Sequence, residues 1–161
     1  MPAHVLLSDA RNDALLETAL RRLPRGSAFV WRHYHLAPAA RAARLAPLAR
    51  LAALRGVTVV LAGPGYGPAH RLSCRTTRGL RLATAHTLRE LGAAARAGAD
   101  AVLLSPVFPT RSHPGAPVLG AVRFNTLARL SPIPVLALGG MTRRHRAHVR
   151  AHGFAAIDGL S

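Results

Sequence analysis

The stretch Ala101-Val-Leu-Leu-Ser-Pro-Val-Phe-Pro-Thr-Arg-Ser-His-Pro-Gly-Ala-Pro-Val-Leu-Gly120 joins a strand-length apolar run directly to a loop of Pro, Gly and small hydroxyl residues. A second apolar run, Pro134-Val-Leu-Ala-Leu-Gly-Gly-Met141, stops on two glycines, where backbone N–H groups can approach an anion without interference from a Cβ atom. The two segments therefore predict neighbouring strands whose ends form one ligand-binding face.

Outward from these strands, short apolar runs alternate with segments of helical periodicity, which is typical of βα units around a parallel sheet. Strands are predicted near residues 4–8, 27–33, 57–61, 80–84, 100–104, 133–138 and 154–158. Helices are predicted near residues 12–23, 38–55, 87–97, 121–130 and 142–152. The residues that mark helix ends are Asn12 or Asp13 as the first cap, Pro38 in a first turn, and Gly56, Gly98 and Gly153 after three last turns.

Seven predicted strands are one fewer than a (β/α)8 barrel requires. The remaining strand would lie in residues 62–74, a segment rich in Gly and Pro with no room for an ordinary helix. Barrels of this type have about 250 residues, whereas this chain has 161. We therefore predict an α/β fold in a single domain, residues 1–161. It is a trimmed (β/α)8 TIM-type barrel, shortened around the third helix and fourth strand and without the last helix.

The 22 basic residues are all arginine and, with only six acidic residues, give a formal net charge of +16. Such a charge normally points to nucleic acid or an anionic membrane. The arginines are spread along the whole chain, with a dense cluster only at residues 143–146, so the sequence argues against a nucleic-acid partner. The remaining expectation is that the surface attracts phosphates and that salt weakens this attraction.

The apolar runs are shorter than a bilayer span, and the N-terminus lacks a charged flank followed by an apolar signal core. These features predict a cytoplasmic protein with no membrane partner. The lone cysteine, Cys74, cannot form an internal disulfide, and no partner residues mark it as a nucleophile. It is interpreted as a small packed side chain.

At the two strand-end segments the chain resembles the thiamine-phosphate synthase/TenI family, as a short and divergent member. That family carries a GADY segment, a strand, a GPVFPT segment and a loop with one lysine and two glycines, followed by a strand that ends in Gly-Gly. The matching positions here are Gly98-Ala99-Asp100, Ser105-Pro106-Val107-Phe108-Pro109-Thr110, Gly115, Gly120 and Leu138-Gly139-Gly140-Met141. The match is close from residue 84 onward, recognisable over residues 4–36, and absent between residues 62 and 75.

The resemblance implies that the chain binds a phosphorylated thiazole, with the phosphate at Gly139, Gly140 and Ser161. This agrees with the rule that barrels bind phosphate near the loops after their last two strands. The alternative interpretation of the two glycines is a tight strand-to-helix turn.

Hydroxyl groups at Thr110 and Ser112 match positions that the family places against the thiazole. His113 stands where the family has a lysine, and a histidine is mostly neutral at a pH where lysine is a cation. Thr84 and His86 match a Ser-x-His segment of the family. In a synthase, Thr84 offers its hydroxyl to pyrophosphate; in a TenI-type tautomerase, the histidine moves protons on a thiazole carboxylate. His86 could instead cap the next helix or bond a backbone carbonyl.

Arg32 matches the arginine that binds pyrophosphate in the family, and a guanidinium group suits a forked phosphate contact. Because side chains alternate along a strand, Val30, Arg32 and Tyr34 are predicted to share one face. Val30 and Tyr34 replace a glutamine and a lysine of the family, so the pyrophosphate half of the site is depleted. His33 and His35 lie on the other face, and without a third ligand they are weak evidence for a metal site.

A synthase of this family uses Mg²⁺ as cofactor, held by aspartates at the ends of its third and fourth strands. The corresponding positions here are Ala62-Gly63 and His70–Ser73, so no metal ligands are identified. Asp100 and Asp158 are interpreted as structural or displaced. Asp9 ends the first strand, where it either orients a ligand or caps the following helix.

Three functions remain open from the sequence. Arg32 and His86 are the predicted catalytic residues, Arg32 in a synthase and His86 in a tautomerase. The first function is a synthase-like transferase of thiamine biosynthesis that binds thiazole phosphate and condenses it with hydroxymethylpyrimidine pyrophosphate. The second is a TenI-like thiazole tautomerase. The third is a non-catalytic basic protein that binds RNA or another anion. We expect an enzyme with small phosphorylated molecules as partners, and homo-oligomer formation stays open.

Overall fold

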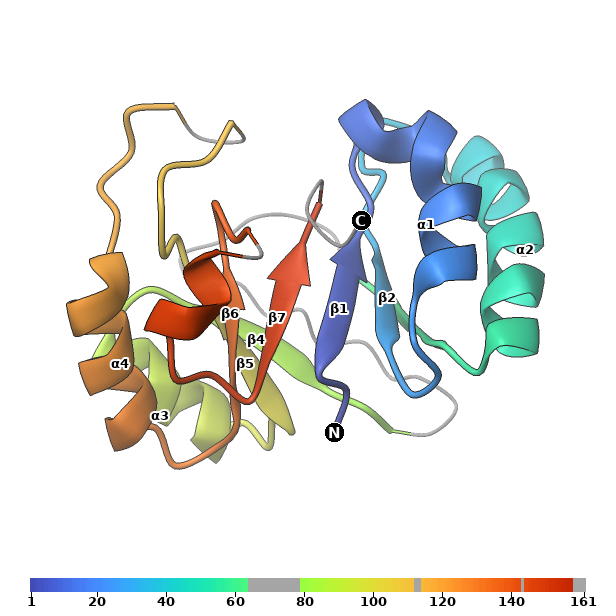
Figure 1. Cartoon of the computed structure of the whole chain (residues 1–161). Helices are drawn as coiled ribbons and strands as arrows, with labels where there is room; N and C mark the ends of the chain where they lie inside the picture. Colours follow the sequence, from blue (N-terminus) through green and yellow to red (C-terminus); the bar gives the residue numbers. More distant parts are fainter. Residues whose placement is uncertain (64–78, 112–113, 143, 158–161) are drawn as a thin grey trace.

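A single curled sheet organises the structure, a computed structural model that describes residues 1–63, 79–111, 114–142 and 144–157. Its seven strands are all parallel and follow the order β3-β2-β1-β7-β6-β5-β4 (Figure 1). The strands are β1 (His4–Leu7), β2 (Ala28–Trp31), β3 (Thr58–Leu61), β4 (Leu82–Ala85), β5 (Ala101–Leu104), β6 (Val135–Leu138) and β7 (Gly153–Ala156). Each predicted strand is present close to its predicted range, so the α/β prediction is confirmed.

The first strand pairs with the last, as it does in a barrel. β1 lies between β2 and β7, with Val5 opposite both Ala28 and Ala155. In the described part of the chain, β3 and β4 are the two edges of the sheet. The prediction of a trimmed TIM-type barrel is therefore confirmed. The predicted shortening falls mainly on residues 64–78, and the predicted loss of the last helix concerns the chain after Ile157; both lie outside the described residues.

Small and branched apolar side chains fill the concave side of the sheet. Along β2, Ala28 and Val30 point into this interior, whereas Phe29 and Trp31 pack against helices on the outside. The buried interior residues are Val5, Leu7, Ala28, Val30, Val60, Ala62, Leu82, Ala101, Leu103, Leu136 and Ala155. Burial of one Val or Leu side chain contributes about 1.5–3 kcal/mol. This layer therefore stabilises the sheet whose strand ends carry the site described below.

Helices cover the convex side in two separate groups (Figure 1). The 3₁₀ helix η1 (Ala10–Leu15), α1 (Leu16–Arg22) and α2 (Pro38–Arg55) lie on the side of β1 to β3. The second group, α3 (Leu88–Arg96) and α4 (Gly120–Leu130), lies over β4 to β6. Within the described ranges, none of these helices is both long and apolar enough to cross a membrane.

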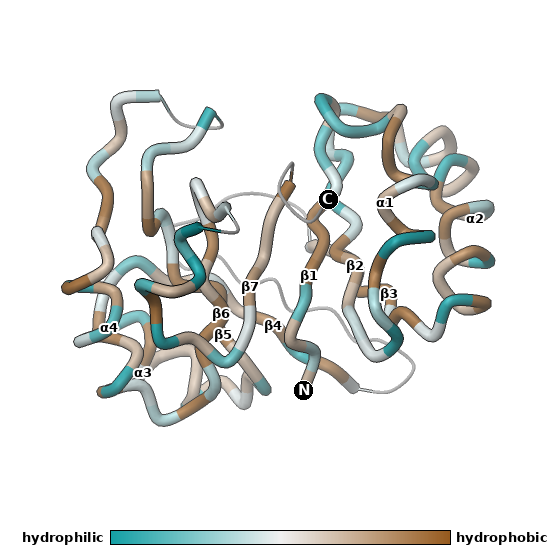
Figure 2. Tube along the Cα trace, viewed as in Figure 1, coloured by the Kyte–Doolittle hydropathy of each residue, from teal (hydrophilic) through white to brown (hydrophobic). Residues whose placement is uncertain are grey.

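The limits of α2 agree with the sequence signals. Pro38 occupies its first turn, and Gly56 forms its C-cap in the left-handed conformation at a φ of 66°. Hydrophobic and hydrophilic residues alternate along α1 and α2 (Figure 2), as expected for helices with one face on a sheet.

The cap of the first helical segment differs from the prediction of Asn12 or Asp13. Asp9 is the N-cap of η1, in a capping box with Asn12, so its capping interpretation is confirmed. The Asn12 amide nitrogen donates instead to the carbonyl oxygens of Leu7 (3.0 Å) and Ile157 (2.9 Å). Asn12 thus bridges the ends of β1 and β7 and is not available as the predicted cap.

The helix predicted over residues 142–152 is wrong. The described residues there form only the 3₁₀ helix η2 (His145–His148), after which the backbone becomes extended at Val149. The side chain of Asn125 on α4 explains the difference, because it donates to the last carbonyl of η2 (3.0 Å) and accepts the N–H of Arg150 (2.7 Å). These bonds satisfy the backbone without a helix and allow Val149 to pack in the core.

Gly153, which was predicted to follow that helix, is instead the first residue of β7. A Cβ atom added here would lie 2.6 Å from the carbonyl carbon of Ala3, which is too close for any side chain. The N–H of Phe154 donates to the same carbonyl oxygen at 2.8 Å. Glycine at this position allows β7 to approach the start of β1.

Candidate functional site

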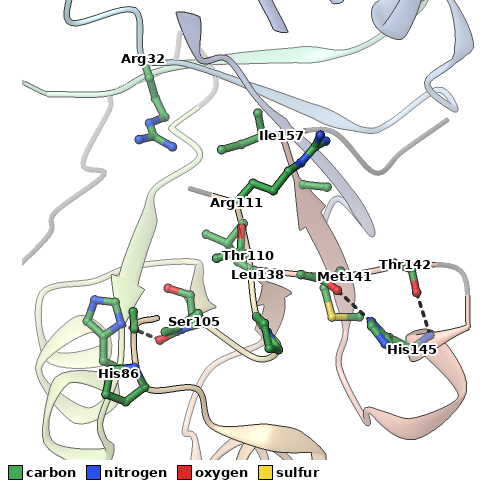
Figure 3. Close-up of a pocket in the computed structure, with 17 residues that line it drawn as sticks. Arg32, His86, Ser105, Thr110, Arg111, Leu138, Met141, Thr142, His145 and Ile157 are labelled. Atoms are coloured by element: carbon green, nitrogen blue, oxygen red, sulfur yellow. Dashed lines mark hydrogen bonds between the residues drawn. The ribbon is translucent and has the colours of Figure 1, made fainter. Parts of the chain in front are cut away.

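A cavity of about 650 Å³ opens where the strands end (Figure 3). Its walls come from the residues that follow β2, β4, β5, β6 and β7, the end of the sheet where parallel barrels bind ligands. The predicted site residues that line it are Arg32, His86, Thr110, Gly139 and Gly140. The half-buried Thr84, within β4, is not among the lining residues. Ser112, His113 and Ser161 lie outside the described residues.

His86 is held in the cavity wall by two hydrogen bonds. Its backbone N–H donates to the carboxylate of Glu90 (2.6 Å), in the first turn of α3. Its ring Nδ1 lies 2.6 Å from the carbonyl oxygen of Ser105, which can only accept, so Nδ1 carries the proton. The neutral ring then has its lone pair on Nε2. The carbonyl bond predicted as an alternative is present, and it orients a ring that also lines the cavity.

The loop after β5 packs tightly on the end of β6. Val107 N–H donates to Leu138 O at 3.0 Å, and Phe108 N–H donates to Gly139 O at 3.1 Å. These bonds hold the loop segment with Thr110 over the cavity. The part of the loop before residue 112 therefore forms one wall of the cavity.

Gly139 and Gly140 have positive φ angles of 94° and 61°. An added Cβ would lie 2.9 Å from Pro106 Cα at the first position and 2.7 Å from Phe108 O at the second. In the described residues, the 3₁₀ helix η2 and no α-helix follows them before β7. Both glycines are required because the loop after β5 packs directly on them, and both line the cavity.

Arg32 brings a half-buried positive charge into the cavity. Burial lowers the pKa of its guanidinium group, whereas the nearby Asp9 carboxylate raises it; an arginine stays protonated in either case. Its backbone N–H donates to Ser8 Oγ at 2.7 Å. Val30 is buried in the barrel interior and Tyr34 is exposed, so neither shares the cavity wall with Arg32.

His145 and Arg111 also line the cavity, although the sequence did not identify them as site residues. His145 Nδ1 lies 2.8 Å from Gly140 O, and its ring stacks on Phe108 with the centroids 4.0 Å apart. Figure 3 shows both arginines in the upper half of the view, with the Arg111 side chain pointing away from Arg32, and His145 well apart from His86. The only signal for His145 in the sequence was its place five residues after the second glycine.

The lining combines two arginines and two histidines with backbone and hydroxyl groups, and none of its described residues is Asp or Glu. Such a composition favours an anionic ligand.

Comparison with known proteins identifies the family. Residues 74–160, more than half of the chain, match the family model described as thiamine monophosphate synthase. The chain belongs to this family. The resemblance inferred from the sequence is therefore confirmed.

Two relatives support the assignment to the thiamine monophosphate synthase family. A protein of Aquifex aeolicus (strain VF5), provisionally named thiamine-phosphate synthase 2, is 37% identical over 78 residues, which make up 48% of this chain and 42% of that protein. The thiamine-phosphate synthase of Myxococcus xanthus (strain DK1622) is 48% identical over 62 residues, or 38% of this chain and 28% of that one. The matches thus span less than half of the length of either relative.

The thiamine phosphate pyrophosphorylase from Pyrococcus furiosus has a similar solved structure. The TM-score is 0.72 over 96% of this chain and 84% of that chain, with 20% sequence identity. At this identity the likeness shows the fold alone, and it agrees with the barrel described above.

The Mg²⁺ that the thiamine monophosphate synthase family implies does not fit the described residues. Magnesium binds oxygen ligands, mainly carboxylates, and the described residues contain no group of three His, Cys, Asp or Glu side chains that could hold a metal ion. Asp9 accepts from the backbone and side chain of Arg11. Asp100 accepts the N–H of Arg81 at 2.6 Å, a structural contact. His70–Ser73, Cys74 and Asp158 lie outside the described residues.

The histidine pair at His33 and His35 is not a metal site either. Both ring nitrogens of His33 already lie within hydrogen-bond distance of other side chains, Ser8 and Asp13. In this member of the thiamine monophosphate synthase family, His33 therefore has a structural environment.

Proposed function

We propose that this cavity binds a phosphorylated thiazole and condenses it with hydroxymethylpyrimidine pyrophosphate to form thiamine phosphate. One observation supports this most directly: a single cavity joins Arg32, His86, Thr110 and the Gly139-Gly140 pair, which come from four separate parts of the chain. Family membership supports the substrate class.

In this proposal the two anionic groups bind at different walls. The pyrophosphate lies at the guanidinium group of Arg32, with Arg111 as a second cation in the cavity lining. The thiazole phosphate lies at Gly139 and Gly140, beside His145. The separation would keep the two negative groups apart while their rings meet near Thr110.

The condensation forms a C–N bond and breaks a C–O bond. The ring nitrogen of the thiazole attacks the methylene carbon of the pyrimidine, and pyrophosphate leaves with the bonding electron pair. Negative charge develops on the leaving oxygen, and cations fixed near that oxygen stabilise the transition state. The described residues that could supply this stabilisation are Arg32 and Arg111.

The test is to supply the purified protein with both substrates and Mg²⁺ and to measure thiamine phosphate by chromatography. Arg32→Ala should abolish the product, whereas Arg50→Ala, an exposed change on α2, should not. Thiazole phosphate binding is measured separately by calorimetry. An equal yield of thiamine phosphate from Arg32→Ala and the wild type would contradict the proposal. If the wild type neither forms thiamine phosphate nor binds thiazole phosphate, the cavity is not the proposed substrate site.

A second candidate function is the isomerisation of a thiazole carboxylate phosphate, and the fixed orientation of His86 favours it. With Nδ1 bonded to Ser105 O at 2.6 Å, Nε2 is the basic atom of the neutral ring. Such an imidazole can remove a proton from one ring atom and return it to another. His86→Ala should then abolish isomerisation, followed by NMR, whereas a synthase should keep most of its condensation rate in this variant. His148→Ala, at an exposed histidine outside the cavity, is the matched control.

A further inference from the structure

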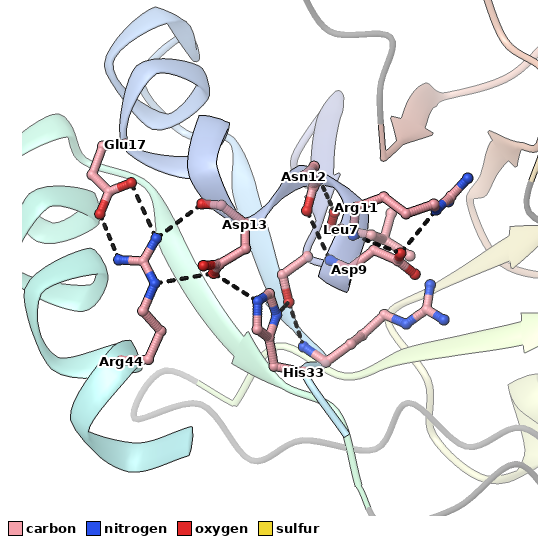
Figure 4. Close-up of polar contacts among 10 residues, drawn as sticks. Leu7, Asp9, Arg11, Asn12, Asp13, Glu17, His33 and Arg44 are labelled. Carbon is pink, nitrogen blue, oxygen red and sulfur yellow. Dashed lines mark hydrogen bonds and ion pairs between the residues drawn. The ribbon is translucent and has the colours of Figure 1, made fainter. Parts of the chain in front are cut away.

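Beside the cavity, Asp13, His33 and Ser8 form a continuous chain of hydrogen bonds, of which Figure 4 labels Asp13 and His33. His33 Nε2 lies 2.8 Å from Asp13 Oδ1, and His33 Nδ1 lies 2.9 Å from Ser8 Oγ. The chain ends on the main chain of Arg32, whose N–H donates to the same Ser8 Oγ at 2.7 Å. It therefore connects the surface of η1 to the residue that carries a cation into the cavity.

These residue types match a serine hydrolase triad, but their environment excludes that chemistry. Ser8 is 0% exposed and His33 is 1% exposed, so no substrate carbonyl can reach the hydroxyl. Ser8 Oγ is also already an acceptor for a backbone N–H. A nucleophile needs an accessible oxygen at a reaction centre. The role of the chain is therefore internal.

The hydrogen-bond directions in this chain are mutually consistent. The Asp13 carboxylate can only accept, so His33 Nε2 carries a proton. In the neutral ring Nδ1 then accepts, and the Ser8 hydroxyl is its donor. Ser8 Oγ keeps a lone pair for the N–H of Arg32. Each polar atom has one defined role, so the position of the Ser8 oxygen depends on the protonation of His33.

The His33 ring has little freedom to move. It stacks on Trp31 with the ring centroids 4.0 Å apart and the planes inclined by 10°. Its backbone has a φ of 29°, a left-handed conformation that is uncommon for residues other than glycine. Unfavourable backbone conformations persist where the surrounding contacts fix them, and they concentrate at functional sites. Here the conformation occurs directly after Arg32.

We propose that the Asp13–His33–Ser8 chain is a positioning device that holds the backbone of Arg32 so that its guanidinium group points into the cavity. The inference rests on the proposed function, in which Arg32 binds the pyrophosphate of the substrate. His33 must be neutral for the device to work, since a protonated ring donates from both nitrogens and no longer accepts the Ser8 hydroxyl proton.

The charges that face His33 support this state. Asp13 approaches from η1 and Arg44 from α2, with Arg44 Nε 3.0 Å from Asp13 Oδ1, and His35 lies beyond the end of β2 with its ring centroid 5.0 Å from that of His33. Burial alone would raise the pKa of Asp13, but hydrogen bonds from Arg44 and His33 outweigh it and lower the pKa. Burial lowers the pKa of His33, and Asp13 only partly opposes this effect.

A double-mutant cycle with inorganic pyrophosphate as probe tests the device. Calorimetry gives the affinity of the wild type, Ser8→Ala, Arg32→Ala and the double variant. Ser8→Ala should weaken binding about tenfold, within the range of couplings between contacting residues. It should cause no further loss in the Arg32→Ala background. Equal losses in both backgrounds would overturn the proposal, because they would indicate a general structural effect.

The same cycle separates this inference from the proposed function. If Arg32→Ala weakens binding but Ser8→Ala does not, only the positioning role fails. If Arg32→Ala itself has no effect, then the pyrophosphate site fails and the positioning role fails with it.

Two substitutions of similar size at His33 keep the test valid if Ser8→Ala folds poorly. His33→Asn retains a short polar side chain that can accept from Ser8, and asparagine tolerates the left-handed backbone. His33→Leu offers no acceptor. Pyrophosphate affinity should be largely retained in the first variant and reduced in the second, and equal affinities would contradict the proposal.

A pH profile provides a readout that a purely structural role would not change. Wild-type affinity should fall when acid protonates His33, and this component should be absent from His33→Asn. The ionisation of pyrophosphate itself affects both proteins equally and cancels in the ratio of their affinities. A ratio that stays constant with pH would contradict the role of the neutral histidine.

Discussion

Residues 1–63 and residues 79–157 contribute strands to the same sheet, yet they fix their polar groups in different ways. In the first region, ionisable side chains bond to one another: Arg44 contacts both Asp13 and Glu17, and Asp13 contacts His33. In the second region, the cavity histidines bond to main-chain carbonyl groups, His86 to Ser105 and His145 to Gly140.

The difference indicates that two kinds of interaction position the residues of the cavity. The wall from residues 79–157 depends on close backbone packing, which salt and pH hardly affect. The support of Arg32 in residues 1–63 depends on charges and a buried imidazole, which respond to both. Substitutions that add volume should therefore damage the second region most, and changes in ionisation should affect the first.

The largest effect is expected for Gly140→Ala. The new Cβ would meet Phe108 O at 2.7 Å, and the φ of 61° is unfavourable for alanine. Steric displacement and backbone strain together should lower the free energy of unfolding by about 3 kcal/mol and abolish thiazole phosphate binding. Denaturant titration followed by circular dichroism measures the first effect.

The matched control for that substitution is Gly26→Ala. Gly26 has a comparable φ of 80°, but an added Cβ meets no atom within 4 Å. Only the conformational cost of about 1 kcal/mol should remain. Equal losses of unfolding free energy in the two variants would show that contact between the loop and Gly140 adds no steric cost to the substitution.

The next largest effect is a loss of pyrophosphate affinity, which should differ between the two arginines of the cavity, one from each region. Arg32 is half-buried and Arg111 is exposed, and a charged hydrogen bond gains strength as water is excluded. Arg32→Ala should weaken pyrophosphate binding about 10- to 100-fold, as expected for the loss of about 1.5–3 kcal/mol. Arg111→Ala should weaken it less than about fivefold. Calorimetry at one salt concentration measures the pyrophosphate affinity of both variants. A larger loss in Arg111→Ala than in Arg32→Ala would place the anion nearer to the exposed arginine.

A smaller effect is expected for Arg44→Met, which keeps the apolar stem but removes the charge. Arg44 Nε lies 3.0 Å from Asp13 and its Nη1 lies 2.5 Å from Glu17, so it ties α2 to η1 and α1. Because these groups are partly exposed, the loss of stability should be about 1 kcal/mol. The loss should shrink at high salt, in contrast to that of Gly140→Ala. Arg50→Met on the same helix should change the unfolding midpoint little at any salt concentration.

The smallest effect is expected from mild acid. Burial lowers the pKa of His33, and the pKa of Asp13 is also lowered, because hydrogen bonds from Arg44 and His33 outweigh its burial. The unfolded chain binds a proton at His33 from about pH 6.5, before the folded chain does, so stability should fall as the pH drops below that value. Asp13 adds a second loss below about pH 4. Melting temperatures from pH 8 to pH 3 should show both losses, and His33→Asn should lack most of the first.

The strands and the positions of several cavity residues could be predicted because their signals are local. Apolar runs that stop at glycine or proline set the strand ends, and alternation along β2 placed Arg32 opposite the outward-facing Trp31. The parallel topology then brings the strand ends to one edge, which is why His86 and the two glycines meet in one cavity. Their roles as substrate ligands stay predictions.

The failures arose where contacts between distant residues override local preference. Residues 142–152 have no intrinsic barrier to a helix, but the amide of Asn125 bonds their backbone in another conformation. The partners of His33 are Ser8, directly after β1, and Asp13 in η1, so neither spacing nor composition could have indicated them. His145 was missed for the same reason, because its place in the cavity depends on the backbone turn that replaced the predicted helix.

The pairing of β1 with β7 has a consequence for how the protein is made. A ribosome releases β1 well before β7, which carries its register partners, such as Ala156 opposite Leu6. During synthesis one edge of β1 has no native partner, and contacts between such distant positions slow folding. The sheet can therefore assemble fully only after translation of β7. Nascent chains halted before Gly153 should present an open strand edge that chaperones bind and that other chains can join.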